Sequence, residues 1–177
     1  TGPMIKNWEY LPQYFEDRDQ ILKIVDQVFS SGHLILGSQV SSFEKNFSKY
    51  TNCKFGVGVN SGTDALFLAL KAFDLKAGDE VITVSNTAIP TVSAIGLTGA
   101  TVKFVDVNPD TFLMDIHQLE GAISPRTKAI IAVHLYGQMV DMNPLLEIAK
   151  KHQIYVIEDC AQAHGATYQN QLSGSLG

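Results

Sequence analysis

The sequence predicts an α/β protein of three layers, in which helices cover both faces of a mostly parallel sheet. Short apolar runs rich in Val and Ile alternate with helical segments, an order typical of parallel β-α-β units with right-handed crossovers. The runs carry few polar residues, as strands buried on both faces do. The 177 residues are 45% hydrophobic and 18% charged, which is enough for one domain with a buried core.

The chain begins with a helical segment. After a Thr1-Gly2-Pro3 stretch that resembles an expression remnant, a helix is predicted over residues 11–30, and Gly32 is well placed to end it. The apolar positions at helix spacing are Ile21, Leu22, Ile24, Val25, Val28 and Phe29. An apolar loop over residues 34–37 either packs internally or reaches a neighbouring subunit, and a second helix follows over residues 41–50.

A regular alternation of strands and helices begins at residue 55. The predicted strands are residues 55–59, 81–84, 102–107, 129–135 and 154–157. The predicted helices are residues 65–73, a segment ending at residue 97, residues 115–123 and residues 142–152. The first of these helices is apolar on nearly all sides, which predicts that it is buried. We divide the chain into an N-terminal helical segment, residues 1–31, and a larger α/β domain, residues 32–177.

The composition argues against several classes of function. The net charge is -5 and there is no Lys/Arg-rich stretch, so neither nucleic acid nor an anionic membrane is an expected partner. No apolar run approaches the roughly 18 residues of a membrane span. Cys53 and Cys160 form no paired motif, and a reducing, cytoplasmic setting is expected. Because the chain stops in a glycine-rich turn, residues 172–177, we expect a fragment of a longer protein.

Two carboxylates end the last predicted strand, and the second of them, Asp159, is the main candidate for a site residue. Ligand sites of open α/β sheets lie just beyond the carboxyl ends of the strands. Gln162, three residues later, shares the pocket if one turn of helix follows. The alternative is that Asp159 merely caps that helix, as Asp often does. This stretch alone leaves both interpretations open.

A second candidate is the turn at residues 60–64, which follows a predicted strand and opens a helix. Free backbone N–H groups and the positive end of the helix dipole bind phosphate at such a position, with Gly62 permitting close approach and Thr63 adding a hydroxyl. An ordinary N-cap is the alternative. A dinucleotide-binding fold is weaker, because Gly56, Gly58 and Gly62 are one residue off the usual fingerprint and no acid ends the second strand.

Other kinds of chemistry find little support. His134 and His164 could join Asp159 as metal ligands, but no recognised ligand spacing occurs and we predict no metal. A polar histidine at a pocket rim is the better interpretation. Ser61 and Ser93 lack the G-x-S-x-G setting of a serine hydrolase.

One cofactor, pyridoxal 5′-phosphate (PLP), accounts for both candidates. Its phosphate needs a helix N-terminus, which Gly62 and Thr63 offer, and its pyridine nitrogen needs a carboxylate, which Asp159 offers. The carboxylate keeps the ring nitrogen protonated, so that the ring can accept electrons. Strands of one parallel sheet would bring both groups to the same edge.

The same residues resemble a known family, the nucleotide-sugar aminotransferases of the DegT type, which are fold-type-I PLP-dependent transferases. The resemblance runs from about residue 32 to residue 177, the incomplete large domain of such an enzyme. The motifs, in order, are Asn60-Ser61-Gly62-Thr63-Asp64-Ala65-Leu66, Gly78-Asp79-Glu80-Val81-Ile82, Gly99-Ala100, Val105-Asp106-Val107, Thr127-Lys128-Ala129-Ile130, His134-Leu135-Tyr136-Gly137 and Glu158-Asp159-Cys160-Ala161-Gln162-Ala163-His164-Gly165.

The resemblance implies a role for each candidate residue. Asp159 pairs with the pyridine nitrogen, Gln162 hydrogen-bonds the phenolic oxygen, and Gly62 with Thr63 holds the phosphate. His164 is expected on the substrate side. Members of the family are typically homodimers that move an amino group from L-glutamate to a nucleotide-linked keto sugar through a pyridoxamine form. The loop near residues 32–37 would reach the partner's site.

Two departures from the family pattern matter. Ala88 occupies a cofactor-contacting position that often carries an aromatic ring, so stacking on the cofactor is weaker or supplied otherwise. The lysine that forms the Schiff base is expected beyond Gly177, because Lys128, Lys150 and Lys151 lie in the wrong places. The chain alone is therefore expected to be inactive. The alternatives are a catalytically dead relative with a binding or regulatory role, and a nicotinamide-dependent oxidoreductase.

Overall fold

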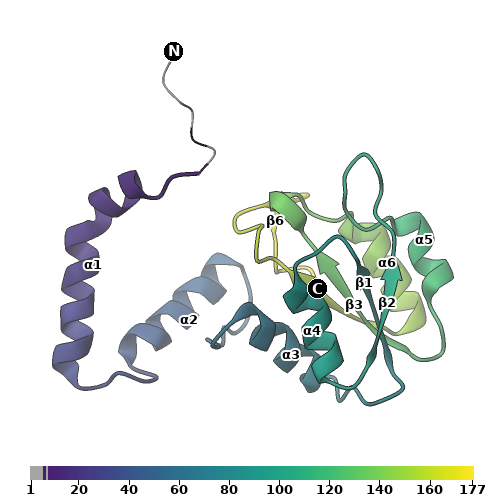
Figure 1. Ribbon diagram of the computed structural model, residues 1–177, viewed down its shortest axis with the longest axis horizontal. Coiled ribbons are helices and arrows are strands. Elements are labelled where there is room, and N and C mark those ends of the chain that lie inside the picture. Colours follow the sequence, from purple (N-terminus) through teal and green to yellow (C-terminus); the bar gives the residue numbers. More distant parts are fainter. Residues whose placement is uncertain (1–5, 7) are drawn as a thin grey trace, which may run out of the picture. The chain divides into compact units, whose positions relative to one another are not determined.

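Figure 1 shows a computed structural model of the chain, which describes residue 6 and residues 8–177. The predicted expression remnant lies outside these residues. The chain forms two compact units, Thr1–Asn46 and Phe47–Gly177, and each is described by itself. The predicted boundary after residue 31 concerns the domains of a whole protein and remains a prediction.

Two helices make up the first unit. Helix α1 spans Leu11–Ser31, and helix α2 spans Ser38–Tyr50, so that the last turn of α2 belongs to the second unit. Gly32 ends α1 as predicted, with a φ of 70° and its N–H donating to the Phe29 carbonyl. The helical spacing of apolar residues is confirmed, but α1 buries none of them: Val25 is 45% exposed and Phe29 69%.

The second unit is a three-layer α/β structure, as predicted. All pairings in its four-stranded sheet are parallel, and the strand order is β2-β1-β3-β4. The strands are β1 (Glu80–Val84), β2 (Thr101–Val105), β3 (Thr127–Val133) and β4 (Tyr155–Asp159). The helices are α3 (Gly62–Ala72), α4 (Ile89–Leu97), α5 (Ile116–Ala122) and α6 (Met142–His152). A 3-10 turn, η1 (Leu135–Gly137), and a hairpin of β5 (Thr167–Tyr168) with β6 (Gln171–Leu172) complete the unit.

The core lies between the sheet and its helices, where α3 packs on α4 and α5 on α6 (Figure 1). Ile82, Ile130 and Ile131 on the two central strands are completely buried, which confirms that their apolar runs are strands covered on both faces. The edge strand β2 is less covered, and Phe104 on it is 50% exposed.

Two predictions made from apolar patterns are wrong. Residues 55–59 are not a strand, because no strand of the described chain pairs with them, and Phe55 and Val57 are 75% and 80% exposed. Helix α3 is not buried on all sides: Leu66 and Leu70 are buried, whereas Leu68 is 50% exposed. In both places the apolar residues are present in the expected pattern, but within the described residues some of their side chains remain exposed.

Within the described residues, no helix is long and apolar enough to cross a membrane.

Candidate functional site

Asp159 is the last residue of β4 and lies at the carboxyl edge of the parallel sheet. The strand runs two residues further than predicted, pairing Asp159 with Val133. Its two carboxylate oxygens are both held: the Thr91 hydroxyl donates to Oδ2 at 3.0 Å, and the Ala161 N–H donates to Oδ1 at 3.2 Å. Since the Thr91 proton is used there, the Thr87 hydroxyl, 2.9 Å from Thr91 Oγ1, is the donor of that second pair.

No helix follows Asp159 in the structure, so the prediction of a helical turn or a helix cap there is wrong. The bond from the Ala161 N–H to Asp159 instead turns the chain, as Asp side chains commonly do. Gln162 still reaches the same place, from this turn rather than from a helix.

A small cavity of about 30 Å³ brings three of the six candidate residues together. Ala88, Asp159 and Gln162 line it with Thr87, Val133, His134, Leu135 and Ala161. Ligand sites usually enclose roughly 300–1,000 Å³. These residues therefore form a floor rather than an enclosed site for a ring-sized ligand.

The side-chain amide of Gln162 is oriented by the backbone of η1. Its oxygen, Oε1, accepts the Tyr136 N–H at 3.0 Å, and Tyr136 has the left-handed backbone conformation (φ 56°) that presents this N–H. Because the oxygen is occupied, the amide NH₂ group remains as the donor. This arrangement suits an anionic or carbonyl oxygen on a ligand above the floor.

Gly62 and Thr63 begin α3, and the structure does not place them in the lining of the Asp159 cavity. Ser61 is the N-cap, its hydroxyl accepting the Asp64 N–H at 3.1 Å, so the predicted ordinary cap is present. The N–H groups of Gly62 and Thr63 have no hydrogen-bond partner within the described chain. A Cβ on Gly62 would meet no atom within 4 Å, which leaves the approach to this helix end open.

The topology orients the start of α3 toward the site. The chain leaves the end of α3 and enters β1 at its first residue, so the first turn of α3 lies toward the carboxyl edge of the sheet. Helix α3 packs on α4, whose N-cap is Ala88. The two helix N-termini therefore face the same sheet edge as Asp159.

His164 lies elsewhere. It is exposed, its ring meets Phe47 edge-on at 6.0 Å between centroids, and it lines a separate cavity of about 300 Å³ with Cys53, Glu158 and Cys160. Burial, aided by the neighbouring Glu158 charge, raises the pKa of the Cys160 thiol to about 12, so this thiol is unreactive at neutral pH. A substrate-side role for His164 remains a prediction.

Glu158 is the residue that sequence reasoning missed. With His134 and Cys160 it forms a group of possible metal ligands within 4.8 Å of one another. The His134 ring is already bonded, since Nδ1 accepts the Val140 N–H at 3.1 Å and Nε2 lies 2.9 Å from Glu158 Oε2. With Nδ1 an acceptor, the proton sits on Nε2 and points at Glu158. The available signal was its position beside Asp159 on a strand, where neighbouring side chains face opposite ways.

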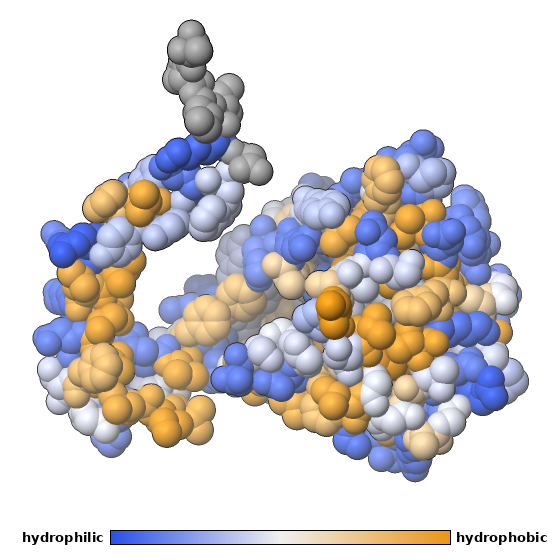
Figure 2. All heavy atoms as spheres, viewed as in Figure 1, coloured by the Kyte–Doolittle hydropathy of each residue, from blue (hydrophilic) through white to orange (hydrophobic). Residues whose placement is uncertain are grey.

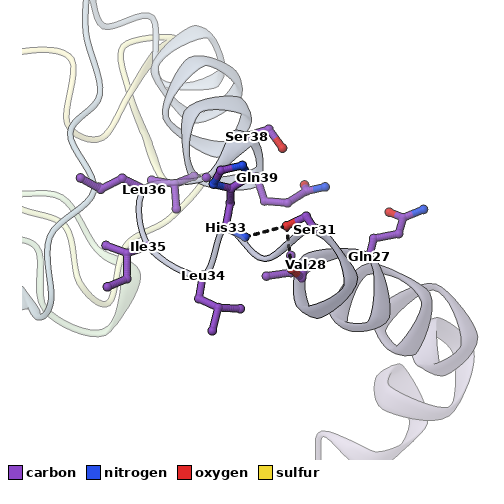
Figure 3. Close-up of a pocket in the computed structure, with 11 residues that line it drawn as sticks. Gln27, Val28, Ser31, His33, Leu34, Ile35, Leu36, Ser38 and Gln39 are labelled. Carbon is purple, nitrogen blue, oxygen red and sulfur yellow. Dashed lines mark hydrogen bonds between the residues drawn. The ribbon is translucent and has the colours of Figure 1, made fainter.

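A larger cavity, about 530 Å³, lies within the first unit between the end of α1, the following loop and the start of α2 (Figure 3). Ser31 organises it, donating to the Val28 carbonyl at 2.7 Å and accepting the His33 N–H at 3.1 Å. The other side chains lining it are aliphatic or polar, among them the His33 imidazole, and no carboxylate or lysine of the described residues lines it.

Comparisons with known proteins show which family this chain resembles. The model of the DegT/DnrJ/EryC1/StrS aminotransferase family matches residues 16–177. A dTDP-3-amino-3,4,6-trideoxy-alpha-D-glucose transaminase from Micromonospora megalomicea subsp. nigra is 49% identical over 169 residues, which is 96% of this chain and 45% of that protein. The chain spans about half the length of the curated relatives it matches.

Two solved structures extend the likeness to the fold. The crystal structure of S. venezuelae DesV with a ketimine intermediate superposes with a TM-score of 0.94 at 40% identity, covering 98% of this chain and 47% of that one. NtdA from Bacillus subtilis, with bound pyridoxamine phosphate (PMP), gives 0.86 at 34% identity, covering 97% and 40%.

Proposed function

Because this chain belongs to the DegT/DnrJ/EryC1/StrS aminotransferase family, we propose that it is part of a PLP-dependent enzyme that moves an amino group from L-glutamate to a nucleotide-linked keto sugar. The observation that carries the proposal is the Asp159 carboxylate, fixed by Thr91 and Ala161 on the same floor as Ala88 and Gln162. The activity belongs to the whole protein, of which this chain supplies the carboxylate side of the site.

The residues suit the cofactor. Asp159, with both oxygens oriented by neutral donors, would hold a protonated pyridine nitrogen. The free NH₂ of Gln162 would donate to the phenolic oxygen, and Ala88 would leave room for the ring. The unpartnered N–H groups of Gly62 and Thr63 would hold the phosphate. When bound, PLP supplies an electron sink for the carbon that exchanges its amino group.

Catalysis needs a base that this chain does not place at the floor. None of its eleven lysines lines the Asp159 cavity. The proton transfer between substrate carbon and cofactor therefore falls to a lysine in the rest of the whole protein. Asp159 and Gln162 bind and orient, and Thr87 and Thr91 keep Asp159 in place.

A spectroscopic titration of the whole protein tests the proposal. We expect bound PLP to lose its visible absorbance when glutamate is added, and to regain it when a nucleotide-linked keto sugar is added. A protein that binds PLP but shows neither change would be the catalytically dead relative. Binding of a nicotinamide cofactor that survives Asp159→Ala would favour the oxidoreductase.

The phosphate role predicts the effect of Thr63→Val. This change removes the hydroxyl and keeps the size of the side chain, so it should weaken PLP binding by roughly tenfold to a hundredfold, the usual effect of losing a hydrogen bond to a charged group. Thr101→Val, on the exposed start of β2, is the matched control. Equal PLP affinities of the two variants, measured by fluorescence titration, would remove Thr63 from the site.

We also propose that the whole protein is a homodimer in which the first unit contacts a second copy. Figure 2 shows apolar side chains along α1. The apolar residues of this helix include Ile21, Leu22, Ile24, Val25 and Phe29, each between 42% and 69% exposed. The loop residues Leu34, Ile35 and Leu36 are also exposed, at 62% to 84%. An apolar surface of this kind on a water-soluble enzyme is typical of an interface.

The dimer proposal predicts that Phe29→Glu shifts the whole protein from dimer to monomer at micromolar concentration, because the new charge would be buried in the interface. Lys23→Glu, on the opposite face of α1 by helical periodicity, introduces the same acidic side chain away from these residues as a control and should leave the dimer intact. Light scattering after gel filtration measures both. If both variants remain dimeric, the proposal that α1 forms the interface is contradicted.

A cytoplasmic location completes the proposal. It is supported by the two free cysteines, Cys53 and Cys160, which are usual in a reducing compartment.

A further inference from the structure

Glu158 is a buried carboxylate for which the proposed reaction has no use. It precedes Asp159 on β4, and its side chain points to the opposite face because side chains alternate along a strand. The Glu158 side chain is only 3% exposed. Burying a charge in this way is costly unless hydrogen bonds compensate it.

Four donors compensate the charge. Glu158 Oε2 accepts from His134 Nε2 at 2.9 Å and from the Gly174 N–H at 3.0 Å. Oε1 accepts the N–H groups of Leu176 and Gly177, both at 2.7 Å. Three of the four hydrogen bonds thus come from the backbone of one glycine-rich turn, residues 174–177. The carboxylate does for this turn what a bound anion does for a loop of free amides.

The charged form of Glu158 is the favoured one. Burial is the largest single influence and opposes the charge, but the hydrogen bonds from His134 and from the turn outweigh it and hold the pKa of Glu158 below its ordinary value. The attachment of the turn is therefore present at neutral pH.

His134 links Glu158 to the segment that orients Gln162. Its Nδ1 accepts the Val140 N–H, which closes the segment containing η1 onto the ring. Within that segment the Tyr136 N–H orients the Gln162 amide. Glu158 thereby joins three parts: the strand end with Asp159, the η1 segment that orients Gln162, and the turn at residues 174–177.

We propose that Glu158 is a positioning residue, whose carboxylate on the back of β4 fixes the Gly174–Gly177 turn and, through His134, the η1 segment relative to Asp159. The inference rests on the proposed function, because the ligand positioned is PLP. It predicts that Glu158, on one face of β4, affects how tightly the cofactor binds at Asp159, on the other face. Glu158 itself lines a different cavity.

The test compares Glu158→Gln with wild type in the whole protein. Glutamine keeps the shape but offers one accepting oxygen, so its NH₂ group must face two of the four donors, either His134 and Gly174 or Leu176 and Gly177. We expect the affinity for pyridoxamine phosphate, a probe that needs no lysine, to fall at least about tenfold. Amide hydrogen exchange at Leu176 and Gly177 should accelerate, and kcat should fall more than the sugar KM changes.

Glu120→Gln is the matched control. Glu120 also accepts two charge-assisted hydrogen bonds, from Lys151 at 2.6 Å and His152 at 2.9 Å, but it is exposed on α5. It should bind the probe like wild type. If Glu158→Gln does not fold, Glu158→Asp keeps the charge while withdrawing the carboxylate, and it must show a smaller loss of the same kind.

Wild-type affinity in a folded Glu158 variant would overturn the positioning role while leaving the proposed function standing. A wild-type protein that binds neither PLP nor pyridoxamine phosphate would instead remove the proposed function, and the positioning role with it.

Discussion

Replacing Asp159 with asparagine in the whole protein is expected to lower kcat by roughly three powers of ten or more, while folding is retained. The isosteric amide can keep its oxygen on the Ala161 N–H and turn its NH₂ group to the Thr91 hydroxyl, which can accept as well as donate, so the local structure is retained. It cannot hold a proton on the pyridine nitrogen, and the ring then loses most of its capacity to accept electrons. Single-turnover kinetics with glutamate would measure the loss.

Asp74→Asn supplies the control for that experiment. Asp74 pairs with Lys76 at 3.0 Å but its side chain is 84% exposed, so removing this charge should leave kcat within about twofold of wild type. Near-wild-type activity of Asp159→Asn would contradict the assignment of Asp159 to the ring nitrogen, whatever the control shows.

The 177-residue chain by itself is expected to have no detectable transaminase activity, a loss at least as large as that of Asp159→Asn. The reason is chemical: the reaction needs a lysine at the cofactor, and none lines the floor formed by Ala88, Asp159 and Gln162. A coupled assay for glutamate consumption, with the whole protein at the same concentration as the positive control, would measure it.

Activity in the isolated chain above that of a no-protein blank would contradict this expectation. It would mean that one of the lysines present, such as Lys128 on β3, reaches the site in solution.

The sheet was predictable because its central strands are buried on both faces. Ile82 and Ile130 belong to short, mainly apolar runs between turn residues, a pattern typical of buried parallel strands, and the parallel order followed from the intervening helices. Residues 55–59 carry an equally good strand pattern, yet a strand also needs a neighbour, and pattern alone does not reveal whether one exists.

The sequence indicated which residues meet at the floor better than it indicated their local structure. Asp159, Gln162 and Ala88 line one cavity, and their roles toward a cofactor stay a prediction. The helix expected after Asp159 is absent, because the Asp159 side chain accepts the Ala161 N–H and turns the chain first. This turn depends on a single side-chain hydrogen bond, which a periodic pattern of apolar residues does not predict.

Glu158 illustrates a further limit. The sequence places two acids side by side at a strand end, and alternation requires them to face opposite ways. The turn at residues 174–177 decides which of the two bonds to the protein, because its backbone N–H groups donate to Glu158. A pattern of side chains does not reveal such backbone donors.

A crystal structure of the whole protein with bound PLP tests the central claim most directly. We predict an Asp159 oxygen within about 3 Å of the pyridine nitrogen, with the phosphate of the same molecule on the N–H groups of Gly62 and Thr63. A phosphate bound away from the start of α3, or a ring nitrogen without Asp159 beside it, would contradict the claim that these two features hold one cofactor.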